Sequence, residues 1–456
     1  MRLIEITRLL NASQHGVSAG DRLLTGVSTD SRSINPGELF VALAGENFDG
    51  HTFVTRAAER GATAALVSGV IADAALPQIL VADTRLALGH LAQGWRQRFH
   101  IPMLALTGSN GKTTVKEMLR AILVAHLGNL DAVLATDGNL NNDIGVPQMM
   151  LRLNANHQVA IFEMGMNHLG EIDYLTRLVE PDVALVIMAG TAHIGELGSR
   201  EAIAQAKGEI FAGLKADGIA VINMHDRFGT YWKELAGAHR VMGFGVIAED
   251  DVWATLVDDP QRPLSISCQG GQINVRLHVL GHHNRRNALA AAAGACALGV
   301  PLAAIKVGLE SFHGVAGRLQ TYCGHNSATI IDDTYNANPD SVKAAIAVLA
   351  EFPPPRILVL GDMGELGSDA AAMHADVGAC AREAGIDSFC ATGELMQDAV
   401  RAFGKGGEHF QEIDVLVNAL KPRLTANSHV LVKGSRFMKM ERVVAQLVPN
   451  YHGAHH

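Results

Sequence analysis

One short segment limits the possible folds of this chain more than any other. The apolar run 103–107 leads into a glycine-rich loop, and residues 115–123 continue it with the pattern of a helix. The loop consists of Gly108, Ser109, Asn110, Gly111, Lys112, Thr113 and Thr114. A strand, a glycine-rich loop and a helix in this order are typical of a parallel α/β sheet.

The residue types in this loop suit a chain of phosphate groups. Glycines allow backbone N–H groups to close around phosphate oxygens, and the helix N-terminus adds positive potential. Lys112 can reach the terminal phosphates, and Thr113 is placed to bind Mg²⁺. Leu106 stands where the common pattern has its first glycine, so the loop is the shorter GxxGKT form. We predict a nucleotide-binding loop at residues 108–114.

The rest of the chain alternates between apolar runs and helical patterns, which indicates parallel sheets covered on both faces. Further strands of the central sheet are predicted at 159–163, 183–188 and 219–223, with a hairpin at 264–268 and 273–280. Shorter runs before it lie at 39–43, 64–67 and 79–81. Runs after it lie at 329–331, 357–360, 389–392 and 429–432, and Asn338 is expected to cap a helix that begins at Pro339.

These patterns predict an α/β protein of three domains. We expect a small N-terminal α/β domain at 1–85, a central P-loop-type parallel-sheet ATPase domain at 86–314 and a C-terminal Rossmann-like domain at 315–456.

Composition and charge limit the kinds of partner and the cellular compartment that this protein can have. The 456 residues carry a net charge of −9, so no basic surface is expected for nucleic acid. The uncharged stretch 287–300 is shorter than the roughly 20 residues of a membrane span and is predicted to be a buried helix. Five scattered cysteines without a CxxC pair favour reduced thiols in the cytosol.

Two side chains are predicted at the carboxyl ends of central strands. Glu163 ends the run 159–163, and His193 follows the run 183–188. These strand ends line the ligand crevice of an open α/β sheet. A carboxylate there suits Mg²⁺, although Glu163 could instead cap a helix or face solvent. A single histidine such as His193 is more often structural than a metal ligand.

Lys207 is the one charged residue on an apolar helical stripe. If 201–214 is a helix with about 100° per residue, Ile203, Lys207 and Ile210 share one face. The side chain could extend out of the core. An unpaired buried ammonium is costly, so a chemical partner or a modification is the alternative.

Four further residues have open interpretations. Asn284 and Asn287 begin an alanine-rich segment and could cap its helix or read the edge of a base. Arg318 and Asp333 lie in the third region, where surface charges are the default.

Together these residues resemble the Mur ligase family, the cytoplasmic enzymes that build the peptide stem of peptidoglycan. The resemblance runs through all three regions. It implies that residues 108–114 bind ATP and that Mg²⁺ is held by Thr113, Glu163, His193 and Lys207. It also implies a carbamate on Lys207, which converts the ammonium into an anionic oxygen ligand. Lys112, Lys207 and His193 would then be the catalytic residues.

The same resemblance assigns the open residues to ATP. Asn284 and Asn287 are similar to the family's adenine-side motif, and Arg318 and Asp333 match residues that a mobile C-terminal domain brings to the nucleotide. Motifs at 29–32, 36–43 and 49–51 resemble a uridine-nucleotide domain, which implies substrate contacts from Ser31, Arg32 and Asp49.

Motifs at 136–147, 335–339 and 361–367 resemble the family member that adds D-alanyl-D-alanine, and imply substrate contacts from Thr136, Asn141 and Asn142. The Asp-Asn-Pro-Arg signature with which the preceding ligase holds diaminopimelate is absent. The expected reaction joins D-Ala-D-Ala, bound by the C-terminal domain, to UDP-MurNAc-tripeptide, bound by the N-terminal domain. ATP and Mg²⁺ are the expected cofactors, and the reaction passes through an acyl phosphate.

Three alternatives stay open at this point: another amino-acid ligase of this family, a non-catalytic muropeptide-binding protein, and a generic P-loop ATPase switch. The last leaves the outer two regions without a role. We expect a cytoplasmic monomer without a nucleic-acid partner or membrane insertion.

Overall fold

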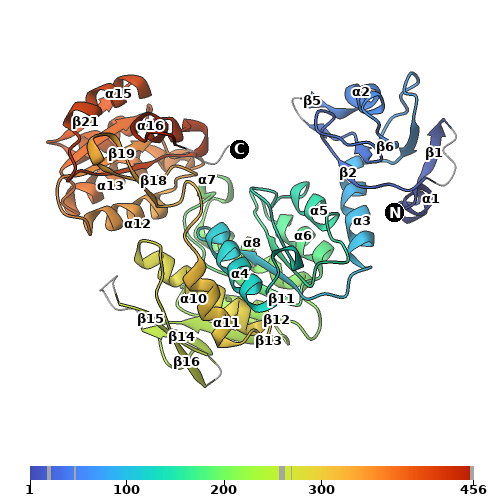
Figure 1. Cartoon of the computed structure of the whole chain (residues 1–456), viewed down its shortest axis with the longest axis horizontal. Helices are drawn as coiled ribbons and strands as arrows, with labels where there is room; N and C mark the ends of the chain where they lie inside the picture. Colours follow the sequence, from blue (N-terminus) through green and yellow to red (C-terminus); the bar gives the residue numbers. More distant parts are fainter. Residues whose placement is uncertain (18–21, 46–47, 256–261, 269, 452–456) are drawn as a thin grey trace.

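The computed structural model describes residues 1–17, 22–45, 48–255, 262–268 and 270–451. Three α/β parts are each built on their own sheet, and the first and last stand on opposite sides of the middle one (Figure 1). This architecture confirms the predicted fold class. Within the described ranges, no helix combines the length and the apolar character that a membrane span requires.

The central sheet has the strand order β16-β15-β14-β13-β12-β11-β8-β10-β9. Its strands are β8 (Met103–Thr107), β9 (Val133–Ala135), β10 (Val159–Glu163), β11 (Val183–Val186), β12 (Ile219–Asn223), β13 (Arg240–Gly245), β14 (Val252–Thr255), β15 (Leu264–Cys268) and β16 (Gly271–Val275). From β9 to β14 neighbouring strands are parallel, and β15 and β16 form the predicted antiparallel hairpin. The second hairpin strand begins and ends earlier than predicted.

Alternate residues of the central strands face two separate cores, as side chains of a strand point to opposite faces. On one face Leu104 and Leu106 pack with α4 (Lys112–Leu127), α10 (His282–Ala297) and α11 (Leu302–Ser311). On the other, Met103 and Ala105 belong to the core of α5 (Gly145–Met150), α6 (Glu171–Val179), α8 (Arg200–Gly208) and α9 (Gly229–Leu235). Most of the stretch 287–300 is therefore part of a buried core helix, as predicted, and this helix ends at Ala297.

The helix predicted at 201–214 is interrupted. The α-helix α8 ends at Gly208, and the chain continues as the 3-10 helix η3 (Glu209–Gly213). The hydroxyl of Thr176 donates to the carbonyl of Ile210 at 2.7 Å, and the carboxylate of Glu209 accepts from the backbone of Gly170 at 2.8 Å. These contacts with α6 hold the segment in the tighter turn.

The C-terminal sheet has the order β17-β18-β22-β19-β20-β21. Its strands are β17 (Gln320–Cys323), β18 (Thr329–Asp333), β19 (Arg356–Gly361), β20 (Ser388–Thr392), β21 (Gly407–Phe410) and β22 (His429–Lys433). One face carries α12 (Pro339–Ala350), α13 (Ala370–Glu383) and α14 (Met396–Phe403), and the other carries α15 (Ile413–Leu420) and α16 (Glu441–Leu447). Asn338 caps α12, as predicted, by accepting from the backbone N–H of Ser341 at 2.9 Å.

The N-terminal sheet has the order β1-β7-β6-β3-β2. Its strands are β1 (Ser13–Gly16), β2 (Val27–Ser28), β3 (Leu39–Val41), β6 (Ala64–Val67) and β7 (Pro77–Leu80). The helices α1 (Leu3–Leu9) and α2 (Val54–Glu59) lie beside it, with the short pair β4 (Ala44–Gly45) and β5 (Phe48–Asp49). The helix α3 (Thr84–Arg96) leads from this sheet to the central domain (Figure 1).

Candidate functional site

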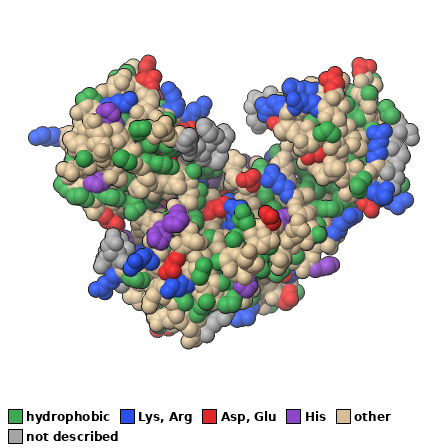
Figure 2. Space-filling view, viewed as in Figure 1, with side chains coloured by type: hydrophobic (Ala, Val, Ile, Leu, Met, Phe, Trp, Pro, Cys, Tyr) green, Lys and Arg blue, Asp and Glu red, His purple; other side chains and the backbone are tan. Residues whose placement is uncertain are grey.

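The carboxyl ends of the central strands and the C-terminal domain line one cavity of about 1050 Å³. Charged side chains and histidines gather around the hollow between the domains in Figure 2. The cavity brings together most of the predicted site residues: Ser109, Asn110, Gly111, Lys112, Thr113, Thr114, Asn141, Asn142, Glu163, His193, Asn284, Asn287, Arg318 and Asp333. Gly108, Thr136, Lys207, Ser31, Arg32 and Asp49 are not among its lining residues.

The glycine-rich loop has little room for side chains. Gly111 is in the left-handed region with φ 84°, and a Cβ there would collide with the side chain of Asn287. The ammonium of Lys112 donates to the carbonyl of Gly108 at 2.8 Å. Burial lowers the pKa of Lys112, while the nearby carboxylate of Glu163 opposes this shift. The loop thus places a cation next to backbone N–H groups at the start of α4.

Glu163 is only 2% exposed at the end of β10. One carboxylate oxygen accepts from the side-chain amide of Asn141 at 2.8 Å, and the other, Oε2, is buried without a hydrogen-bond partner in the described structure. Leaving an ionised oxygen unsatisfied is costly. The vacant lone pairs of Oε2 therefore suit a cation, and the sequence alternatives of a helix cap or a solvated side chain do not apply.

The hydroxyl of Thr136, which the sequence predicts to contact substrate, forms a hydrogen bond inside the central domain. It accepts from the backbone N–H of Glu163 at 2.9 Å, and the residue is 1% exposed. Thr136 therefore fixes the backbone of Glu163 and is not among the lining residues of the cavity, and its contact with substrate stays a prediction.

Lys207 is 2% exposed and lies on the buried side of α8, as the stripe predicted. Among the described residues, no hydrogen bond or ion pair holds its ammonium. Burial, and to a smaller degree the positive charge of Lys112, lowers the pKa of Lys207 well below its ordinary value. Lys207 is thus predisposed to the neutral amine form.

His193 lies on the cavity wall just before α7 (Ile194–Leu197). Its Nδ1 is 2.8 Å from Oε2 of Glu365, which belongs to the C-terminal domain. In the described structure the two atoms are close, but Nδ1 has no hydrogen-bond partner with good alignment. The contact with His193 lowers the pKa of Glu365.

Asn284 and Asn287 join in a chain at the start of α10. Asn287 donates its amide to Oδ1 of Asn284 at 3.0 Å, and Asn284 donates to the carbonyl of Leu280 at 2.8 Å. The helix is preceded by Gly281, and no side chain caps it. Of the two interpretations open from the sequence, the helix cap is therefore wrong, and both amides lie on the cavity wall, with that of Asn287 next to Gly111.

The C-terminal domain supplies charges close to the loop. Arg318 donates to the hydroxyl of Thr113 at 3.1 Å, and its guanidinium lies 4.3 Å from the centre of the Tyr335 ring. The ammonium of Lys433 is 2.6 Å from the carboxylate of Asp333. Burial raises the pKa of Asp333, and the charge of Lys433 opposes this.

Sequence reasoning missed several cavity residues of this domain, including Tyr335, Asp340 and Glu365. The motifs 335–339 and 361–367 were the available signal, but they gave no indication of which side chains face the loop.

Ser31, Arg32 and Asp49 lie in the N-terminal domain and do not line the cavity. The side chain of Arg32 is 75% exposed and pairs with Asp30 at 2.8 Å. The hydroxyl of Thr29, in the same segment, accepts from the amide of Gln148 in the central domain at 2.7 Å. This bond connects the segment with the rest of the protein.

Comparisons with known proteins agree with this architecture. The family descriptions "Mur ligase family, catalytic domain", "Mur ligase middle domain" and "Mur ligase, glutamate ligase domain" match residues 23–96, 106–295 and 317–436. The UDP-N-acetylmuramoyl-tripeptide–D-alanyl-D-alanine ligase of Escherichia coli is 43% identical over 453 residues, which cover 98% of each chain.

Two solved structures are also similar. A crystal structure of MurF from Acinetobacter baumannii has 39% identity and a TM-score of 0.89, and 97% of each chain is covered. The MurF ligase of Thermotoga maritima in complex with ADP has 27% identity and a TM-score of 0.80, with 93% of this chain and 97% of the other covered. With family matches in all three domains and a full-length relative at this identity, the chain belongs to the Mur ligase family.

Proposed function

We propose that this protein is an ATP-dependent ligase that joins D-Ala-D-Ala to UDP-MurNAc-tripeptide in peptidoglycan precursor synthesis, forming ADP and phosphate. The observation that carries the proposal is the single cavity in which the loop 108–114, the unsatisfied oxygen of Glu163 and the C-terminal residues meet. The full-length relative from Escherichia coli bears the name of this reaction. We place the reaction in the cytoplasm, where ATP is available.

The chemistry has two steps. A carboxylate oxygen of the tripeptide attacks the γ-phosphorus of ATP, the bond to the β-phosphate oxygen breaks, and an acyl phosphate and ADP form. The amine of D-Ala-D-Ala then attacks the acyl carbon, loses a proton, and phosphate leaves. Water hydrolyses acyl phosphates, so the site has to exclude it. Docking of the C-terminal domain over the loop serves this purpose.

The residues of the chain bind and orient the nucleotide. Within the described part of the chain Lys112 donates to the carbonyl of Gly108 and can turn to the phosphates, while Arg318 adds a second cation beside Thr113. Fixed positive charge where negative charge develops is a large part of catalysis of phosphoryl transfer. Asn284 and Asn287 are proposed to contact the adenine, and Arg318 and Asp333 the rest of the nucleotide.

The donor set fits a divalent cation. We propose that Thr113, Glu163, His193 and a carbamate on Lys207 hold Mg²⁺, which neutralises phosphate charge when bound. Among the described residues there is no group of three or more His, Cys, Asp or Glu that could hold a metal, so hydroxyl, carbamate and phosphate oxygens have to complete the shell. The low pKa of Lys207 favours the neutral amine that adds to CO₂ with loss of one proton.

The three domains are proposed to divide the substrates. Residues 1–85 bind the UDP end through Ser31, Arg32 and Asp49, and residues 315–456 bind D-Ala-D-Ala. Asn141 and Asn142, on the cavity wall of the domain 86–314, are proposed to hold the stem peptide.

Phosphate release from ATP tests this function. Turnover should require UDP-MurNAc-tripeptide and D-Ala-D-Ala together, and omission of either is the control. Mass spectrometry should detect UDP-MurNAc-pentapeptide. Robust turnover with the dipeptide precursor and a free diamino acid would instead assign the chain to a different ligation step.

A further inference from the structure

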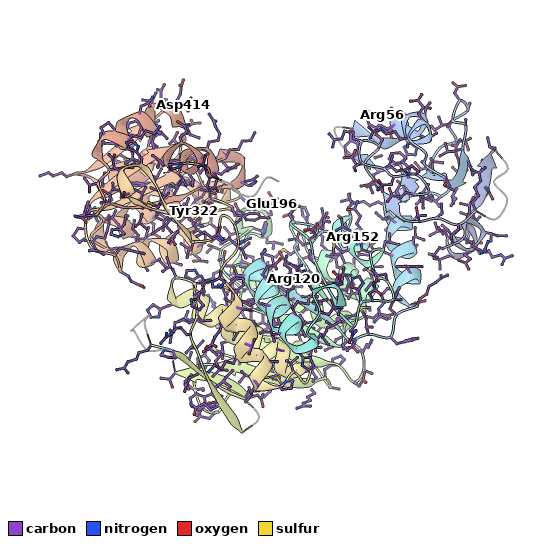
Figure 3. All side chains as sticks on the ribbon, in the orientation of Figure 1. Arg56, Arg120, Arg152, Glu196, Tyr322 and Asp414 are labelled. Atoms are coloured by element: carbon purple, nitrogen blue, oxygen red, sulfur yellow. The ribbon has the colours of Figure 1, made fainter. Side chains whose placement is uncertain are left out.

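The loop 361–367 of the C-terminal domain meets the central domain at α7. The backbone N–H of Gly195 donates to the carbonyl of Glu365 at 3.0 Å. A Cβ on Gly195 would lie 2.7 Å from this carbonyl and 2.6 Å from the backbone nitrogen of Gly367, so only glycine allows this approach. Figure 3 labels Glu196 of α7 where this helix lies beside the C-terminal domain.

The backbone at both partners of the His193–Glu365 pair is unusual. His193 has φ 63° and Glu365 has φ 62°, which places two non-glycine residues in the left-handed region opposite each other. This conformation is uncommon for residues with a side chain and tends to occur at functional sites. The two side chains meet between these two segments, with Nδ1 of His193 2.8 Å from Oε2 of Glu365.

The Nδ1 of His193 faces the carboxylate of Glu365, which leaves Nε2 as the ring atom available to another ligand. Histidines that bind metals commonly direct their second ring nitrogen to a carboxylate, which fixes the tautomer and the orientation of the ring. Here the carboxylate belongs to a different domain from the histidine. Its position relative to the ring therefore depends on where the C-terminal domain docks.

We infer that Glu365 is a positioning residue that acts through His193, so that docking of the C-terminal domain completes the metal site. This inference rests on the proposed metal site at His193. Docking of the C-terminal domain and binding of the metal–nucleotide complex are then coupled equilibria. Such coupling is reciprocal: if docking tightens binding by some factor, binding favours the docked arrangement by the same factor.

The test measures ADP binding by calorimetry at a series of Mg²⁺ concentrations, without acyl or amine substrate. Glu365→Ala should leave ADP binding without Mg²⁺ unchanged and should weaken the Mg²⁺-dependent tightening by about tenfold or more. Glu365→Gln keeps an oxygen opposite Nδ1 and the size of the side chain, and should lie between wild type and Glu365→Ala. Glu383→Ala removes a carboxylate of α13 whose side chain is 74% exposed, and is the matched control.

A double-mutant cycle tests whether Glu365 acts through His193. In a His193→Ala background, Glu365→Ala should have no further effect on the Mg²⁺ dependence. An equal loss in that background would overturn the inference, as would an unchanged Mg²⁺ dependence in both Glu365 variants. If Mg²⁺ does not tighten ADP binding to the wild type, the proposed metal site fails and the inference with it. If the wild type responds and Glu365→Ala responds equally, only the inference fails.

Discussion

Asn110 of the glycine-rich loop and Asn338 of the C-terminal domain form a reciprocal amide pair. Asn338 donates to Oδ1 of Asn110 at 2.8 Å, and Asn110 donates to Oδ1 of Asn338 at 3.4 Å. Nearby, the carboxylate of Asp340 accepts from both the backbone and the hydroxyl of Thr191, at 2.7 and 2.9 Å. The N-terminus of α12 is thus docked directly on the loop.

Because Asn338 both caps α12 and donates to Asn110, two substitutions at this position should affect turnover and stability differently. In Asn338→Asp the side chain still caps α12 but can no longer donate to Asn110, and its charge would face the phosphates. We expect turnover to fall by roughly fivefold or more, since a lost hydrogen bond is worth about 1 kcal/mol and the new negative charge repels phosphate, with little change in thermal stability. Asn338→Ala should also lose about 1 kcal/mol of stability with the cap. Equal turnover in Asn338→Asp and wild type would contradict the role of the pair.

The sequence predicted the local parts of the site well. Glu163 and His193 were placed on the cavity rim because strand ends can be read from apolar runs, and the loop 108–114 can be read from its glycines. Their chemical roles stay predictions. Contacts between domains have no such local signal: Glu365, Asp340 and Tyr335 reach the cavity only through the packing of two separate folds. Similarly, the break in the predicted helix 201–214 depends on contacts with α6, and β9 is too short to stand out.

Lys112→Ala tests the loop. The ammonium should contact phosphates in the reaction, and in this structure it donates to the backbone carbonyl of Gly108. Turnover should fall by about 10²- to 10³-fold, as when one preorganised donor is removed from a developing charge. Phosphate release and thermal unfolding measure the two effects, with the exposed Lys233→Ala as control. Near-normal turnover in a folded variant would remove Lys112 from the mechanism.

The buried side chain of His283 should make the free energy of unfolding fall at acid pH. Burial, followed by the charges of Lys433, Arg286 and His282, lowers the pKa of His283 to about 4. The unfolded chain therefore binds more protons between about pH 6.5 and 4, so stability is retained above this window and falls as the pH drops through it. Between pH 7 and 4.5 the free energy of unfolding of His283→Gln should fall less than that of the wild type, by up to roughly 3 kcal/mol. Thermal midpoints of both proteins across this pH range measure the difference.

His126→Gln, at an exposed position, should follow the wild type across the same pH range and serves as the control. An identical pH dependence of the thermal midpoint in His283→Gln and wild type would show that His283 titrates normally.

The last prediction concerns the carbamate on Lys207. A free ammonium next to a divalent cation is repelled, whereas a carbamate offers an anionic oxygen, and the lowered pKa of Lys207 supplies the neutral amine it needs. Lys207→Ala should nearly abolish turnover, and acetate or formate in solution should restore part of it. Lys215→Ala, which removes a lysine paired with Asp182, should show no such rescue.

The carbamate itself can be tested with CO₂. The wild type should lose activity when CO₂ is stripped and regain it with bicarbonate, and ¹³CO₂ should give a carbamate signal by NMR that Lys207→Ala lacks. A fully active, metal-loaded enzyme without that signal would show that Lys207 acts as an unmodified amine.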